Sequence, residues 1–324
     1  MIDFLSLLSS VNAFKLVAKD KQTNSLSHAY LIIHEDGENL KTVLKNFAKI
    51  FLCEELFPCD KCLSCSRIES ETYADLIVYP KDKEKGVVTN DIVELIEESY
   101  VKPIEGKKKI FIIDHAESMN PASQNKLLKT LEEPADNVHI ILGTTNVHAL
   151  LPTVVSRVKK LEIPAFDKDT LISVLSVECP DKKALKNAVE FSDGTIGGAL
   201  AFYLNPDKTA IIDFVKDLII NMKSSKQIID YSIKITDLLG VLDVLETIYK
   251  EMLLVVSGGK KETDNEVVKY ILESAEGYNV GALIYALDKI TEARKRLKFN
   301  GNEGAISEWL LFQILEGKYK WQKS

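Results

Sequence analysis

The sequence predicts an α/β domain built on a parallel five-stranded sheet, followed by an all-helical remainder. Up to about residue 165, apolar runs of strand length alternate with amphipathic segments of helix length. The strand-length runs are apolar without alternation, as expected of strands that are buried on both faces of a sheet. Beyond that point the strand signals stop and helical periodicity continues to the end of the chain.

The clearest single element is a short helix between Asn120 and Pro134. Asn120 can accept hydrogen bonds from the first free N–H groups, Pro121 suits the first helical position, and Pro134 stops the helix. Apolar runs at 110–114 and 139–144 lie on either side of it, so the helix joins two buried strands in a βαβ unit. Three of its polar side chains are expected to face solvent: Gln124, Lys126 and Lys129.

The other elements follow in chain order. An opening helix is expected over residues 2–22, further strands at 28–33, 75–80 and 160–164, and further helices at 40–50, 90–102 and 150–157. Three short helices, at 169–176, 181–191 and 195–204, precede a long helical region. We therefore expect three domains: the α/β domain over 1–165, a three-helix segment over 166–206 and a helical domain over 207–324.

Composition and charge limit the class of protein. With 324 residues, 46% of them hydrophobic, the chain can bury large cores. Its apolar runs are shorter than the roughly 20 residues that span a bilayer, and its start lacks the basic region of a leader peptide, so we expect a soluble cytoplasmic protein without a membrane partner. The net charge of −7 argues against a chain that binds DNA alone through bulk electrostatics. Local DNA contacts stay open at Lys126, at Lys129 and from Arg294 to Arg296.

Four of the five cysteines lie between residues 53 and 65, in a C-x5-C-x2-C-x2-C pattern. They are Cys53, Cys59, Cys62 and Cys65. An intracellular chain uses such a cluster for metal more often than for disulfides. Four thiolates leave no coordination position for water, so the pattern predicts a structural zinc site inserted in the α/β domain. A redox dithiol and a DNA-binding zinc finger remain as alternatives.

The loop after the first strand, at residues 34–42, is the place where a nucleotide-binding phosphate loop would lie. Such a loop needs the spacing G-x-x-x-x-G-K followed by Ser or Thr. The sequence has one glycine there, Gly37, and only the pair Lys41 and Thr42 resembles a remnant of the motif. Three acidic residues of the loop would repel a triphosphate: Glu35, Asp36 and Glu38. After the strand at 110–114, His115 stands where an ATPase has its catalytic glutamate.

Together these motifs resemble the delta-prime family of bacterial DNA polymerase III clamp-loader subunits, within the AAA+ superfamily. The resemblance is carried by the segment from Gln124 to Pro134, the cysteine cluster, the run from His28 to Leu31, and the pair Ser156 and Arg157. It implies an AAA+-type sheet domain with flanking helices, a small helical lid over 166–206 and an all-α collar over 207–324. Two features depart from the family pattern: Val158 replaces a cysteine, and the C-x5-C spacing is short, which leaves the exact zinc geometry open.

The resemblance also implies a role. The chain would be a non-catalytic stator of the replicative clamp loader, without a Walker A motif, a catalytic glutamate or a bound nucleotide. It would join gamma/tau motor subunits and a delta subunit in a hetero-pentameric ring that loads the sliding clamp onto primer-template DNA. Arg157, with Ser156, matches the arginine that this family presents in trans to a neighbour's ATP site. The alternative is an ATP-hydrolysing clamp-loader motor, or another AAA+ ATPase with a degenerate phosphate loop.

Overall fold

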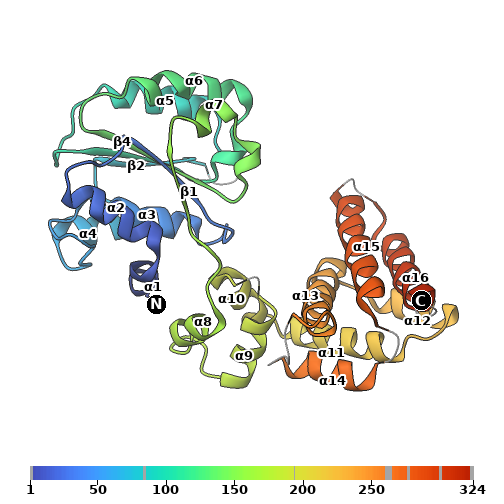
Figure 1. Cartoon of the computed structure of the whole chain (residues 1–324). Coiled ribbons are helices and arrows are strands. Elements are labelled where there is room, and N and C mark those ends of the chain that lie inside the picture. Colours follow the sequence, from blue (N-terminus) through green and yellow to red (C-terminus); the bar gives the residue numbers. More distant parts are fainter. Residues whose placement is uncertain are drawn as a thin grey trace. The chain divides into compact units, whose positions relative to one another are not determined.

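The computed structural model describes residues 3–82, 85–192, 194–259, 265–275, 278–298 and 301–321. The chain divides into two compact units, residues 1–189 with 193–200 and residues 190–192 with 201–324. The first contains the sheet with its covering helices, and the described part of the second is helical (Figure 1). This grouping joins most of the expected lid to the sheet, and the division into three domains stays a prediction.

The first unit is built on a parallel five-stranded sheet, which confirms the predicted fold class. Its strands are β1 (Ala29–Ile33), β2 (Leu76–Tyr79), β3 (Lys109–Ile113), β4 (Val138–Thr144) and β5 (Lys159–Glu162). They lie side by side in the order β2-β3-β4-β1-β5. In this register Leu31 of β1 pairs with Leu142 of β4 on one side and with Lys160 of β5 on the other. The carboxyl ends of parallel strands share one edge, so the loops that follow β1, β3 and β4 meet there.

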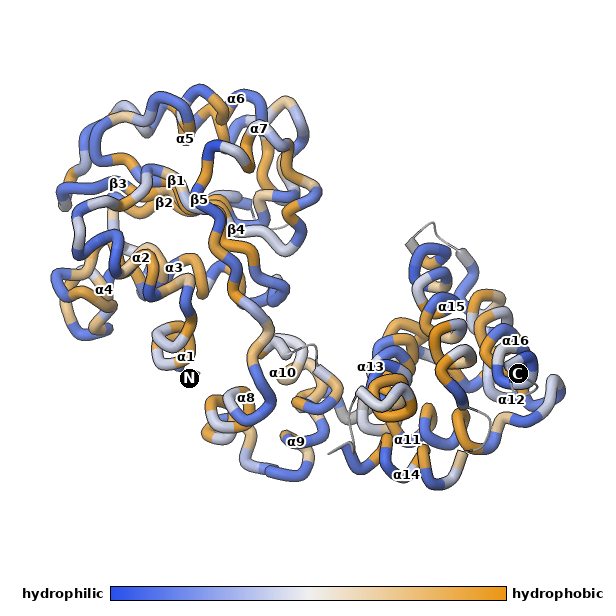
Figure 2. Tube along the Cα trace, viewed as in Figure 1, coloured by the Kyte–Doolittle hydropathy of each residue, from blue (hydrophilic) through white to orange (hydrophobic). Residues whose placement is uncertain are grey.

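Helices cover both faces of this sheet (Figure 1). On one face lie α2 (Asn12–Gln22) and α3 (Leu40–Leu52), and on the other α5 (Thr89–Ser99), α6 (Pro121–Glu132) and α7 (Pro152–Val155). Successive strand residues face opposite clusters: Tyr30 and Ile32 pack with the α3 side, and Ala29 and Leu31 with the α6 side. Figure 2 shows hydrophobic residues gathered along the strands and on the inner sides of these helices.

Helix α6 begins and ends close to the predicted positions. The Asn120 side chain accepts a hydrogen bond from the Ser123 N–H at 2.8 Å, and Pro121 is the first helical residue. Leu127 and Leu131 are buried against the sheet. Lys126 and Lys129 are exposed, as predicted.

The prediction of a single opening helix over residues 2–22 is wrong. The segment consists of α1 (Phe4–Ser10) and α2, because Val11 between them has an extended backbone with φ −76° and ψ 134°. The Val11 side chain is buried in the core on the α3 side of the sheet. Helical periodicity on both sides of one extended residue cannot be distinguished from a single helix by spacing alone.

The remaining helices agree with the predicted all-helical region. The short ones are α8 (Lys168–Leu175), α9 (Lys182–Glu190) and α10 (Ile196–Leu204). The second unit contains α11 (Pro206–Asn221), α12 (Ser225–Lys234), α13 (Leu238–Val256), α14 (Glu266–Ser274), α15 (Val280–Lys298) and α16 (Glu303–Trp321). Among the residues that the structure describes, no helix combines the length and hydrophobicity needed to cross a bilayer.

The basic segment from Arg294 to Arg296 is engaged within its own unit. The Nη2 atom of Arg294 lies 2.6 Å from Asp243 Oδ1 and 2.9 Å from Glu246 Oε2. Arg296 Nη2 donates to Glu292 Oε1 at 2.6 Å. Both guanidinium groups therefore already have carboxylate partners.

Candidate functional site

The loop between β1 and α3 is filled by its own side chains. The Asp36 carboxylate, in a residue that is 4% exposed, accepts hydrogen bonds from the Asn39 N–H and side-chain amide at 3.0–3.2 Å. It also accepts the N–H of Gly197, near the start of α10, at 2.9 Å. A phosphate cradle offers free N–H groups to an incoming anion. Here the negative Asp36 side chain already accepts the Asn39 N–H of the loop and the Gly197 N–H of α10.

The close approach of α10 to this loop depends on a glycine. A Cβ atom at Gly197 would lie 2.6 Å from Asp36 Oδ1 and 3.1 Å from Glu38 Oε2. Any larger residue would push the carboxylate away from the α10 N–H group. The sequence prediction treated Asp36 only as a repulsive charge and missed that it joins this loop to α10.

His115 closes the other side of the loop. Its Nε2 atom lies 3.1 Å from the Gly37 carbonyl oxygen, and its Nδ1 atom lies 3.1 Å from Glu117 Oε1. Glu117 Oε1 also accepts the N–H and the hydroxyl of Thr145, at 3.2 and 2.7 Å. Burial opposes the charged form of His115, but the hydrogen bond to Glu117 and the nearby Asp114 carboxylate raise its pKa above the usual value. The ends of β3 and β4 are thereby tied to the loop after β1.

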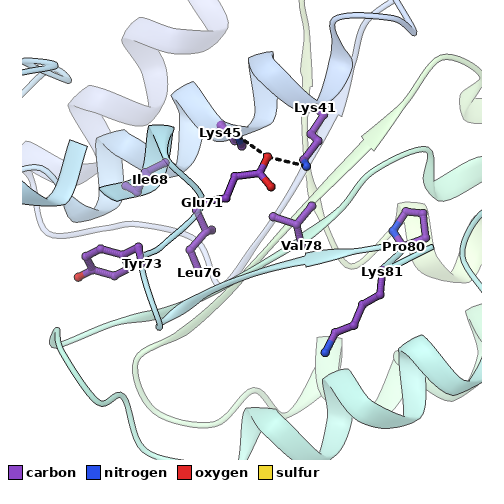
Figure 3. A pocket seen from close by; sticks show the side chains of 9 residues that line it. All are labelled: Lys41, Lys45, Ile68, Glu71, Tyr73, Leu76, Val78, Pro80 and Lys81. Carbon is purple, nitrogen blue, oxygen red and sulfur yellow. Dashed lines mark hydrogen bonds and ion pairs between the residues drawn. The ribbon is translucent and has the colours of Figure 1, made fainter. Parts of the chain in front are cut away.

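Lys41, which stands where the sequence suggests a remnant of a phosphate-loop lysine, is held beside β2. Its Nζ atom and that of Lys45 each lie 2.7 Å from Glu71 Oε1 (Figure 3). The hydrogen bonds from these two lysines lower the pKa of Glu71 to about 2. All three side chains line a pocket of about 360 Å³ together with Leu76 and Val78 of β2. The ammonium group of Lys41 is therefore already paired with a carboxylate of the same chain.

Gln124 is buried, which corrects the prediction that it faces solvent. Its Nε2 atom donates to the carbonyl oxygens of Met119 at 3.0 Å and Ala149 at 3.3 Å. Its Oε1 atom accepts the Leu151 N–H at 2.7 Å. One side chain thus joins α6 to the backbone just before α7, the helix that leads to Arg157.

We expect Gln124→Leu to lower the free energy of unfolding of the first unit by about 2–4 kcal/mol. The substitution leaves the Leu151 N–H and two carbonyl groups without their partner inside the protein. Urea unfolding followed by circular dichroism measures the change. The matched control is Asn125→Leu at the exposed neighbouring position, which should change stability by less than about 0.5 kcal/mol. Equal losses in both variants would mean that the Gln124 hydrogen bonds contribute nothing.

Arg157 lies just beyond α7 and is held by the end of α6. Its Nε atom donates to Glu132 Oε1 at 2.6 Å, and its Nη2 atom contacts the same oxygen. Its Nη1 atom donates to the Thr153 carbonyl oxygen at 2.9 Å and lies 3.4 Å from Ser156 Oγ. The side chain remains 34% exposed. The structure thus brings Ser156 and Arg157 together at the surface and adds Glu132, which the sequence prediction did not identify as a partner.

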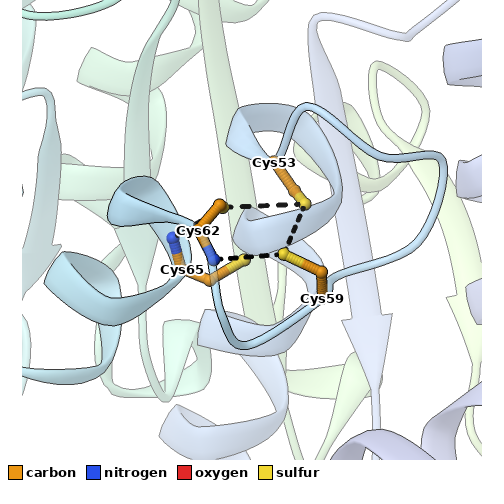
Figure 4. A group of neighbouring side chains, drawn as sticks. All are labelled: Cys53, Cys59, Cys62 and Cys65. Carbon is orange, nitrogen blue, oxygen red and sulfur yellow. Dashed lines mark hydrogen bonds between the residues drawn. The ribbon is translucent and has the colours of Figure 1, made fainter.

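The four clustered cysteines converge on one point (Figure 4). Cys53 ends α3, and Cys62 caps α4 (Leu63–Glu69). All four Sγ atoms lie within 4.8 Å of one another, with 3.7 Å between Cys53 and Cys59 and 3.9 Å between Cys53 and Cys62. Sulfur atoms bound tetrahedrally to one zinc ion at about 2.3 Å are about 3.8 Å apart. The cluster therefore has the spacing of a four-thiolate metal site despite its short first interval.

Neighbouring groups suit a negatively charged thiolate cluster. Backbone N–H groups point at two of the sulfur atoms: that of Cys62 lies 3.3 Å from Cys59 Sγ, and that of Cys65 lies 3.4 Å from Cys62 Sγ. Backbone N–H groups of the loop lower the pKa of Cys59 to about 7, whereas burial raises the pKa of Cys53 and of Cys65 above the usual thiol value. Lys21 Nζ donates to the Cys53 carbonyl oxygen at 2.7 Å. Such outer contacts orient ligands and balance their charge.

Lys49 fastens the cysteine loop to α3. Its side chain is 4% exposed, and its Nζ atom lies 2.8 Å from both Asp60 Oδ1 and Glu69 Oε2. Asp60 belongs to the loop between the second and third cysteines, and Glu69 ends α4. A buried ammonium group needs such partners, so the loop is held in place from inside the unit.

Comparison with known proteins gives related chains. Residues 10–167 match a family model described as DNA polymerase III, delta subunit. The chain is 26% identical over 328 residues to the DNA polymerase III subunit delta' of Bacillus subtilis, covering 94% of this chain and 95% of that protein. It is 31% identical over 168 residues to the DNA polymerase III subunit tau/gamma of Haemophilus influenzae, covering 51% of this chain and 24% of that protein. The chain thus spans about a quarter of the tau/gamma relative and nearly all of the delta' relative.

A solved structure also aligns with the chain. It is a DNA polymerase III gamma subunit-related protein of Thermotoga maritima, with a TM-score of 0.42 and 17% identity. The alignment covers 95% of this chain and 100% of that chain.

Proposed function

We propose that this chain, a member of the DNA polymerase III delta-prime family of clamp-loader subunits, is a stator of a clamp loader. In this role it hydrolyses no ATP itself and supplies Arg157 to the ATP site of a neighbouring subunit. A contrast between the phosphate-loop position and the surroundings of Arg157 supports the proposal. The phosphate-loop position is filled by Asp36 and His115, and Arg157 stays at the surface.

The filled loop argues against nucleotide binding in this chain. A triphosphate entering it would have to displace the Asp36 carboxylate from Asn39 and Gly197 and would meet its negative charge. Like charges at such short range repel strongly where water is excluded. The His115 contacts with Gly37 and Glu117 would have to open as well.

Arg157 has the chemistry required of a group that acts in trans. A guanidinium is always protonated and presents N–H donors in a fixed fork that fits phosphate oxygens. Charge that develops on a transferring phosphoryl group is stabilised by such an arginine in many ATPases and GTPases. The partial exposure of Arg157 leaves it accessible to a neighbouring subunit.

We further propose the partners and the metal. The neighbours would be gamma/tau motor subunits and a delta subunit in a hetero-pentameric ring, which loads the sliding clamp onto primer-template DNA. The fit of the four cysteines to a tetrahedral ion supports zinc with a structural role. All four coordination positions would be thiolates, so the metal would hold the loop together without a reactive water molecule.

The test uses the isolated chain. We expect it to bind no ATP in equilibrium dialysis with labelled nucleotide and to release no phosphate above the uncatalysed background. The alternative function, an ATP-hydrolysing motor with a degenerate phosphate loop, draws support from the similarity to the tau/gamma relative. Only that alternative predicts turnover by the chain alone, and turnover that disappears in Lys41→Ala would establish it.

A further inference from the structure

Glu132 is the side chain that holds Arg157, and we propose that it is a positioning residue for the reaction in trans. It fixes the guanidinium so that its remaining N–H groups can donate hydrogen bonds to phosphate oxygens of the neighbouring nucleotide. This inference rests on the proposed function of Arg157. It assigns to Glu132 a role in the reaction without direct contact to the nucleotide.

The count of donors supports this role. A guanidinium has five N–H groups, one on Nε and two on each Nη atom. Glu132 Oε1 engages Nε and Nη2 together, which is the side-on edge of the group. Nη1 donates to the Thr153 carbonyl oxygen at 2.9 Å and makes a longer contact of 3.4 Å with Ser156 Oγ. We assign the end-on edge, which has one N–H on each Nη atom, to the phosphate, because Glu132 does not bind it.

Glu132 and Arg157 lie on parts of the chain that are held together by packing and hydrogen bonds. Glu132 is the last residue of α6. The buried face of this helix packs on the sheet through Leu127 and Leu131. The Gln124 side chain bonds α6 to the backbone before α7, at Ala149 and Leu151, which precede Arg157 by eight and six residues. The position of the carboxylate relative to Arg157 is therefore set by packed elements of one unit. A catalytic group that is held on rigid elements loses little entropy when it reaches its reactive position.

The contact geometry also decides whether Glu132 positions Arg157 for the reaction or holds it back from the phosphate. If Glu132 bound the end-on edge, its carboxylate would compete with phosphate, and removing it would release Arg157 for the reaction. Glu132 instead binds the side-on edge, so its loss frees the side chain to rotate away from the useful direction. The two possibilities predict opposite changes in turnover.

The experiment uses the complex assembled with the partner subunits, with DNA-stimulated ATP hydrolysis as the readout. We expect Glu132→Ala to lower kcat about tenfold and to change KM for ATP by less than about twofold, because alignment is lost while nucleotide binding by the neighbour is intact. Glu132→Gln keeps an oxygen acceptor for the side-on edge, so we expect a loss of only about threefold. The control is Glu133→Gln, which removes the same charge from the adjacent exposed residue and should behave like the wild type.

A second readout follows Arg157 in the isolated chain. In nitrogen-15 NMR spectra of the wild type and of Glu133→Gln, its Nε–H resonance should be sharp and shifted from the position of a free arginine side chain. In Glu132→Ala the resonance should move to the free-arginine position. Wild-type kcat in Glu132→Ala, combined with impaired turnover in Arg157→Ala, would overturn the inference and leave the proposed function standing. A rise in kcat in Glu132→Ala would overturn it by showing restraint. Full turnover in Arg157→Ala would remove the proposed function itself.

Discussion

Replacing Arg157 by alanine in this chain should lower ATP hydrolysis by about a thousandfold at the ATP site that it serves in the assembled complex. In the proposed role the guanidinium acts only when charge develops during phosphoryl transfer, so we expect the loss to appear in kcat. The complex should still assemble, because the side chain is partly exposed and its contacts lie within its own unit. Steady-state phosphate release in the presence of primed DNA, with the mass of the complex as a check on assembly, measures both quantities.

Arg157→Lys is the control for charge. Lysine keeps the positive charge but lacks the planar fork and cannot bind Glu132 side-on while presenting two further donors. We expect this variant to recover only a small part of the lost turnover. Wild-type turnover in Arg157→Ala would exclude the residue as a trans group, and full recovery in Arg157→Lys would show that only its charge matters.

The second large effect concerns the cysteine cluster. Cys62→Ser should abolish zinc binding and unfold the segment from the end of α3 to α4, because structural zinc sites contribute on the order of 10 kcal/mol of apparent binding free energy. Zinc content by inductively coupled plasma mass spectrometry should fall from one ion per chain to none. The melting temperature should fall with it. A chelator should produce the same fall in the wild-type chain.

The control is Cys179→Ser, which removes the one cysteine outside the cluster. It should keep one zinc ion per chain. A Cys62→Ser chain with full zinc content, or with unchanged thermal stability, would contradict the structural assignment. Loss of DNA affinity by the isolated chain in Cys62→Ser would instead favour the DNA-binding finger, since a structural zinc predicts a change in stability alone.

Much of the fold could be predicted because its signals are local. The strand runs are apolar along their whole length, and Asn120, Pro121 and Pro134 mark the ends of α6 within a few residues. The cysteine pattern is also local, since tight turns bring its members together. Val11 shows the limit of such signals, because its extended backbone separates two helices whose apolar spacing is that of one helix.

The contacts that define the candidate site are not local. The sequence predicts Gln124 on the surface, because spacing within the helix does not reveal that two of its hydrogen-bond partners lie 25 and 27 residues further along the chain. The bond between Asp36 and Gly197 joins positions 161 residues apart, and that between Arg157 and Glu132 joins positions 25 apart. Spacing within an element carries no information about such pairs. One signal was available: an acidic residue at the end of one helix and an arginine at the end of the next can meet when both helices cover the same face of a sheet.

The proposed function requires Arg157 to stabilise the transition state at a neighbour's ATP site. The most direct measurement compares the affinity of the complex for ADP and for ADP with aluminium fluoride, which mimics the transferring phosphoryl group, in the wild type and in Arg157→Ala. We expect equal affinity for ADP and a loss of at least about a hundredfold for the transition-state mimic in the variant. Equal affinity of both complexes for the mimic would contradict it.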